Sequence, residues 1–80
     1  MGERWTPKVI KSYAPYAMRD RTDPMNTVLM TLPETDRTLF MEAYGERRLR
    51  REMGAEWGIS GWQICRHLTR IVDAIAASLN

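Results

Sequence analysis

The sequence has one cysteine and one histidine, and this scarcity excludes several classes of protein. Cys65 has no second cysteine with which to form an intramolecular disulfide. Cys65 and His67 lie two residues apart on a predicted helix and face different directions, so they do not suggest a zinc site. No nucleophile, base and acid can be assembled from one cysteine, one histidine and scattered carboxylates, and the chain has no glycine-rich phosphate loop. We therefore expect no enzymatic activity, no metal and no cofactor, and we interpret His67 as a half-buried packing residue.

Long apolar runs and strand patterns are also lacking. No stretch approaches the roughly 18 apolar residues that a membrane span needs. Met1 is followed by Gly-Glu-Arg-Trp rather than by the basic start and apolar run of a signal peptide. The chain shows no period-two alternation and no Asn-Gly or Asp-Gly hairpin turn. These absences predict an all-α, cytoplasmic protein with no membrane partner.

Helical periodicity is what the chain does have. Its 80 residues are enough for one domain, and its hydrophobic fraction of 44% is ordinary for a globular protein. We expect a small bundle of about five helices. The first helix is expected to begin at Pro7, after the capping Thr6, and the second at Pro24, after the capping Asp23. The other three are expected to cover residues 34–45, 48–57 and 61–79. Pro15 is expected to interrupt the first helix, because proline removes a backbone donor. Residues 1–24 then form a helical extension to a domain of residues 25–80.

Residues 48–79 carry the strongest functional signal. Leu49, Met53 and Trp57 recur every four residues, as on the inner face of a helix, so Trp57 is predicted to be core. Gly58 supplies the left-handed conformation that ends such a helix. Ser60 can cap the next helix, and Gln63 completes a Ser-x-x-Gln capping box. Two helices that meet across a three-residue turn with a glycine make a helix-turn-helix.

The last predicted helix is longer than its neighbours. Its apolar stripe consists of Ile64, Leu68, Ile71, Val72, Ile75 and Leu79. A helix of about 19 residues is roughly 28 Å long, more than a compact bundle of short helices covers. Ile75 and Leu79 must therefore pack against the N-terminal helix, which we prefer, or against the same helix of a second copy in a homodimer.

The net charge of +2 is weak support for a polyanionic partner, but four arginines gather within residues 47–51. Cationic side chains at the start of the first motif helix could hold phosphates, which positions a protein on DNA without reading its sequence. The alternative is a solvated helix face in which Arg48 and Glu52 are neighbours four residues apart.

The run LPETDRTLFMEAYGERRLRREMGAEWGIS, followed by Ile64 and Leu68, resembles region 4 of bacterial sigma factors. The family pattern falls without a gap on Leu32-Pro33-Glu34, Asp36-Arg37, Leu39-Phe40, Tyr44, Arg51-Glu52-Met53-Gly54, Trp57 and Gly58-Ile59-Ser60. The resemblance covers about residues 25–80. It implies a four-helix bundle whose last helix enters the DNA major groove and reads a promoter element, while another surface touches RNA polymerase. Nothing before Leu32 resembles the sigma region that melts promoters, so we expect a small free-standing regulator of the phage or mobile-element kind.

The chain departs from the family at two places. Arg47-Arg48-Leu49 stands where family members usually have Gly-Leu-Ser, so the first motif helix lacks its capping serine. The positions that usually carry base-reading side chains hold Gly61, Trp62, Cys65 and Arg66. Arg66 is the strongest reader among them, ideally through a bidentate contact to guanine.

The leading hypothesis is a DNA-binding transcriptional regulator with double-stranded DNA as its partner. The candidate contacts are Arg47, Arg48 and Arg51 on phosphates and Ser60, Trp62, Gln63, Arg66 and Arg70 along the second motif helix. Trp62 could touch a thymine methyl, a partner protein or the other motif helix. One alternative is a protein-interaction module of the same fold that binds RNA polymerase or a sigma factor. A weaker one is DNA recognition by a phage small-terminase-like subunit.

Overall fold

The computed structural model describes residues 4–80, and their regular structure is entirely helical. The helices are α1 (Pro7–Ala17), α2 (Pro24–Thr31), α3 (Glu34–Phe40), α4 (Arg50–Trp57) and α5 (Gly61–Leu79), and α3 continues into a short π-helical segment, η1 (Met41–Gly45). Within residues 4–80 no helix is both long and apolar enough to cross a bilayer. The predicted small all-α bundle with a long C-terminal helix is confirmed.

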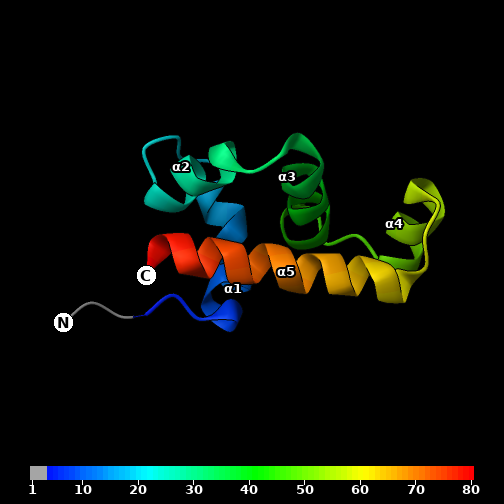
Figure 1. Cartoon of the computed structure of the whole chain (residues 1–80). Helices are drawn as coiled ribbons and strands as arrows, with labels where there is room; N and C mark the ends of the chain where they lie inside the picture. Colours follow the sequence, from blue (N-terminus) through cyan, green and yellow to red (C-terminus); the bar gives the residue numbers. More distant parts are fainter. Residues whose placement is uncertain (1–3) are drawn as a thin grey trace.

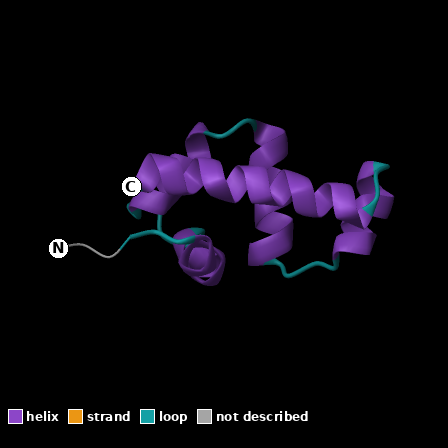
Figure 2. Ribbon diagram, turned by 60° about the horizontal axis from the view of Figure 1, so that its bottom comes forward, coloured by secondary structure: helices purple, strands orange, loops and turns teal. Residues whose placement is uncertain are grey.

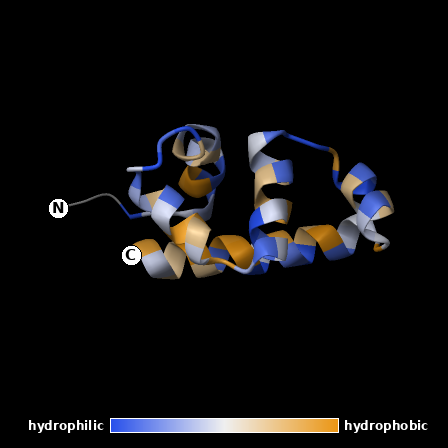
Figure 3. Cartoon of the chain, turned by 90° about the horizontal axis from the view of Figure 1, so that it is seen from above, coloured by the Kyte–Doolittle hydropathy of each residue, from blue (hydrophilic) through white to orange (hydrophobic). Residues whose placement is uncertain are grey.

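Helix α5 is the element against which the others pack. Figures 1 and 2 show it as a long rod, with α4 at its N-terminal end and α1, α2 and α3 arranged along the remainder. Most of its predicted apolar stripe lies inside the bundle: Ile64, Leu68, Ile71, Val72 and Ile75 are each at most 1% exposed, and Leu79 is partly buried. Apolar and hydrophilic residues alternate along α5 in Figure 3, as expected for a helix with one buried face.

The first two helices begin at the caps that the sequence predicts. The Thr6 hydroxyl accepts a hydrogen bond from the Val9 amide, and Asp23 Oδ1 accepts one from the Met25 amide at 2.9 Å. The other carboxylate oxygen of Asp23 accepts a hydrogen bond from the Tyr13 hydroxyl. Asp23 is only 9% exposed. One carboxylate thus starts α2 and ties it to α1.

Helix α1 does not end before Pro15, so that prediction is wrong. The helix continues to Ala17, and the Met18 amide donates to the Ala14 carbonyl at 3.1 Å, so the backbone ladder resumes after the proline. Ala14 and Ala17 are completely buried in the core. Packing of this last turn offsets the single backbone hydrogen bond that proline removes.

The C-terminal half of α5 packs within its own chain. Ile75 is completely buried, and the Asn80 side chain both accepts from the Trp5 amide at 2.9 Å and donates to the Trp5 carbonyl at 3.1 Å. This confirms the intramolecular alternative, in which the N-terminal helix covers the end of α5. Ile10 of α1 belongs to the same core as α5, so the predicted extension is part of one packed unit.

Candidate nucleic-acid interface

Helices α4 and α5 are joined by the turn Gly58-Ile59-Ser60. Gly58 has a φ of 74°, the left-handed conformation predicted for the end of the first motif helix. The backbone amides of Gly58 and Ile59 both donate to the Gly54 carbonyl. These bonds satisfy a backbone acceptor at the helix end and hold the turn in place.

The predicted capping box at the start of α5 is present. The Ser60 hydroxyl accepts from the Gln63 amide at 3.1 Å, and the Ser60 amide donates to Gln63 Oε1 at 3.0 Å. Both residues are exposed. Because the Gln63 side-chain carbonyl is engaged in the cap, a bidentate contact of Gln63 with adenine requires the box to open.

The two helices approach each other closely at two glycines. A Cβ at Gly54 would lie 2.5 Å from the Ile59 carbonyl oxygen, too close for any side chain without a backbone shift. A Cβ at Gly61 would lie 3.5 Å from backbone atoms of Arg50 and Arg51, which is ordinary van der Waals contact. The first turn of α5 therefore rests directly on the first turn of α4.

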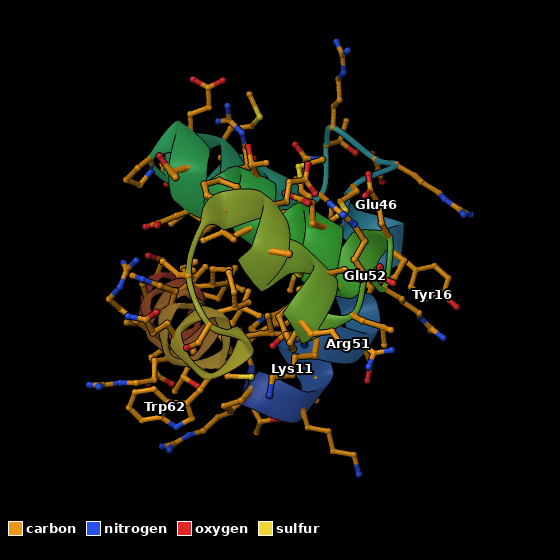
Figure 4. All side chains as sticks on the ribbon, turned by 90° about the vertical axis from the view of Figure 1, so that its right-hand side faces the viewer. Lys11, Tyr16, Glu46, Arg51, Glu52 and Trp62 are labelled. Atoms are coloured by element: carbon orange, nitrogen blue, oxygen red, sulfur yellow. The ribbon has the colours of Figure 1, made fainter. Side chains whose placement is uncertain are left out.

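The outward side of α5 presents a cationic and aromatic surface. Trp62 is 67% exposed, and the Arg66 guanidinium lies 4.9 Å from the centroid of its indole ring, within range of a cation–π interaction. Figure 4 shows Trp62 projecting from the ribbon at the N-terminal end of α5. A shallow groove of about 350 Å³ follows, lined by Gln63, Arg66, His67 and Arg70.

His67 is exposed, so its predicted role as a half-buried packing residue is wrong. Ile64, Leu68 and Ile71 occupy the inward positions of α5. His67 follows Gln63 by four residues and therefore shares the outward face. The helical period alone could have placed it there.

Arg70, a candidate DNA contact, is paired with a carboxylate of α3. Its guanidinium donates to both oxygens of Asp36, at 3.1 and 3.0 Å. The Arg70 hydrogen bonds lower the pKa of Asp36 below its usual range, and the Asp36 carboxylate raises the pKa of Arg70. This bidentate contact braces the middle of α5 against α3.

Arg48 is similarly committed within the chain. Its guanidinium pairs with Glu42 and Glu56, and the hydrogen bond to Glu56 is the main reason that the pKa of Arg48 is raised. The Trp57 indole N–H donates to Glu42 at 3.3 Å. Trp57, predicted to be core, is partly buried and packs against the core. The expected Arg48–Glu52 neighbour pair is replaced by these contacts, which join η1 to α4.

Arg47 and Arg51 are both exposed. Arg47 has a φ of 57°, the left-handed conformation that side chains other than glycine adopt at a cost. Leu49 is the N-cap of α4 and is 53% exposed, so its predicted place on the inner face of the helix is wrong. It makes no side-chain capping bond, as expected where serine is missing. The start of α4 thus combines a preceding residue in an unfavourable conformation with an N-cap that makes no capping bond.

Lys11, which sequence reasoning missed, and Arg50, one of the four arginines within residues 47–51, lie beside the same aromatic ring. Lys11 Nζ and Arg50 Cζ lie 5.8 and 5.1 Å from the centroid of the Tyr44 ring. The three residues come from α1, α4 and η1, and no local pattern connects positions so far apart in the chain. The arrangement depends on how α1 packs against η1.

The described residues, 4–80, contain no cluster of three or more side chains suited to holding a metal ion. Comparison with known proteins gives no match among family models, curated proteins or solved structures. The resemblance to sigma factor region 4 therefore stays a prediction from the residues themselves.

Proposed function

We propose that this protein is a DNA-binding transcriptional regulator in which α4 and α5 form a helix-turn-helix and α5 is the recognition helix, beginning at Ser60. The observation that carries the proposal is the division of the first turns of α5 into two faces. Ile64 is completely buried, whereas Trp62 and Arg66 are exposed on a helix whose start is held by a capping box. A major groove about 12 Å wide admits one helix, and the first residues of a recognition helix reach the base edges.

The contacts within the chain divide the candidate residues into two groups. Arg66 is the proposed reader of bases, and the exposed Arg47 and Arg51 are the proposed phosphate contacts. Arg48 and Arg70 are already paired with carboxylates. Their proposed role is to hold α4 and α5 in position, because a DNA contact would have to compete with those pairs.

The ungapped region 4 pattern, from Leu32 to Ser60, is a second line of support. By this resemblance the protein would act in the cytoplasm, without a cofactor or catalytic activity. The replacement of the usual base-reading residues by Trp62 and Cys65 implies a target different from the family's promoter element.

Selection of bound duplexes from a random pool at moderate salt tests the proposal. An enriched motif is expected, and affinity for it should fall steeply with salt because neutralised phosphates release counterions. Arg66→Ala should lose the preference at one or two base pairs while retaining weak binding to any duplex. Failure of the wild-type protein to bind any duplex at low salt would rule the function out.

One surface favours a second candidate, a protein-interaction module that binds RNA polymerase or a sigma factor. A groove of about 730 Å³ is lined by residues of α2, α3, η1 and the segment between α1 and α2, including Met18, Met30, Met41, Arg21 and Arg37. Methionine side chains adapt to different apolar partners. Recovery of purified RNA polymerase in a pull-down with the protein, after nuclease treatment, would favour this candidate. Failure to recover the polymerase would count against it.

The phage small-terminase-like alternative requires a ring-like oligomer. Light scattering that shows a monomer at working concentration would exclude it.

A further inference from the structure

Two positive charges from different helices converge on the ring of Tyr44. Lys11 of α1 and Arg50 of α4 both lie within cation–π range of its centroid, at 5.8 and 5.1 Å. The ring is itself held in place, because it packs edge-on against the buried Phe40 with centroids 5.2 Å apart. Lys11 and Arg50, which are 39 residues apart in the sequence, therefore both lie near the same aromatic ring.

Neither cation is neutralised within the described chain. The ion pairs of residues 4–80 engage Arg48 and Arg70, not Lys11 or Arg50. Arg50 donates one hydrogen bond to the Arg48 carbonyl at 3.2 Å, which orients its guanidinium without cancelling its charge. Two positive charges near one ring, neither of them in an ion pair within residues 4–80, favour an anion nearby.

The pair adjoins the proposed recognition helix. The first residue of α5, Gly61, lies against the Arg50 backbone, where a Cβ would be 3.5 Å from the Arg50 carbonyl carbon. Figure 4 shows Lys11, Arg51 and Trp62 in the lower half of the view from the α4 end of the molecule. When the start of a helix enters the major groove, the phosphates that border the groove lie beside that start.

We infer that Lys11 and Arg50 form a seat for one phosphate of the DNA backbone, and we call these two residues with Tyr44 the Tyr44 seat. The inference rests on the proposed function and extends it to α1, which lies outside the region 4 resemblance. The N-terminal helix then has two roles, because its inner face completes the core and Lys11 contacts DNA. Such a contact positions the duplex and carries no sequence information.

The test measures dissociation constants over a series of salt concentrations for the selected duplex and for an unrelated duplex of equal length. The proteins are the wild type, Lys11→Ala, Arg50→Ala and the double variant. Each phosphate contact contributes about 0.9 to the slope of log affinity against log salt. The double variant is expected to lower the slope by about 0.9 and to weaken both duplexes by the same factor.

Two further variants serve as controls. Lys11→Arg keeps the charge and is expected to bind like the wild type. Arg21→Ala removes one positive charge at the methionine-lined groove, which is a different surface, and is expected to leave the slope unchanged. If Arg50→Ala destabilises α4, Lys11→Ala alone still tests the inference. Alanine is the best helix former and residue 11 is exposed, so Lys11→Ala is not expected to destabilise α1.

The outcomes separate the seat from the function. An unchanged slope in the double variant, with normal binding by the wild type, overturns the seat and leaves the proposed function standing. A slope lowered by about 1.8 indicates two separate phosphates and also overturns the shared seat. A wild type that binds no duplex overturns both.

Discussion

The guanidinium of Arg66 lies 4.9 Å from the centroid of the Trp62 ring, one helical turn away on the outward face of α5. Trp62 is 67% exposed, so this pair forms at the surface rather than in the core. A stacked guanidinium has less rotational freedom to lose when it binds a base. We therefore expect Trp62 to position Arg66 for the proposed contact with DNA, in addition to any contact of its own.

Replacement of Arg66 by alanine should weaken binding to the selected duplex. A bidentate contact with guanine is worth about 1–3 kcal/mol, which corresponds to roughly a 5- to 150-fold loss of affinity. Fluorescence anisotropy with the selected duplex and with single-base variants measures the effect. Arg66→Lys keeps the charge but not the planar fork, so it should restore non-specific binding only. Equal losses on all duplexes would show that Arg66 contacts phosphate instead.

Replacement of Trp62 by alanine should weaken binding less, by about 0.5–1 kcal/mol, the value of an exposed cation–π interaction. A double-mutant cycle with Arg66→Ala measures the coupling directly. We expect Trp62→Ala to have little effect once Arg66 is gone. Additive losses in the double variant would show that Trp62 acts by an independent contact.

Replacement of Arg47 by glycine should raise stability and lower DNA affinity. Arg47 has a φ of 57°, and the left-handed conformation costs a non-glycine residue about 1–2 kcal/mol, part of which glycine loses again through its greater freedom when unfolded. We expect a net gain of up to about 1 kcal/mol, which corresponds to a rise in Tm of at most about 4–8 °C. Arg51→Ala is the matched control, because it should weaken DNA binding without the gain in Tm. A lower Tm for Arg47→Gly would contradict the assigned strain.

Replacement of Leu49 by serine should stabilise the start of α4. Leu49 is the N-cap, makes no capping bond and is 53% exposed, so little burial is lost on substitution. A serine hydroxyl here would form a capping box with Glu52, and a good cap contributes about 0.5–2 kcal/mol. Urea denaturation measures the gain. Leu49→Ala removes the leucine without supplying an oxygen, and equal stability of the two variants would show that no cap forms.

Replacement of Asp36 by asparagine should change how stability depends on pH. Arg70 holds the pKa of Asp36 below its usual value, so the stabilisation is present above the unfolded value of about 3.9 and is lost as pH falls through the folded pKa. Asp36→Asn should be less stable at neutral pH by no more than about 1 kcal/mol, since Arg70 is exposed to solvent. It should also lose less stability than the wild type between pH 4 and about pH 2. Parallel acid profiles of the two proteins would indicate that the contact is energetically neutral.

Local chemistry made much of the fold predictable. The caps at Thr6, Asp23 and Ser60 and the left-handed Gly58 each depend on a few neighbouring residues, and the structure contains all of them. The continuation of α1 through Pro15 is not predictable in this way. The backbone hydrogen bond that proline removes is outweighed by the burial of Ala14 and Ala17, which the neighbouring sequence does not reveal.

The candidate interface was predictable only in part. The exposed positions of Trp62 and Arg66 follow from the helical period of α5, and the same period would have placed His67 beside them. The partners of Arg48 and Arg70 could not be inferred in this way. Asp36 and Arg70 are 34 residues apart, and only the packing of α3 on α5 brings them together.

The sequence by itself determined where the helices begin and end around the turn and which side of α5 faces the core. Those properties arise from backbone geometry and side-chain period within a few residues. The tertiary structure alone decided which arginines pair with carboxylates of the chain and brought Lys11 to the same ring as Arg50. Pairing and convergence depend on distances between helices, and those distances are set by how the whole core packs.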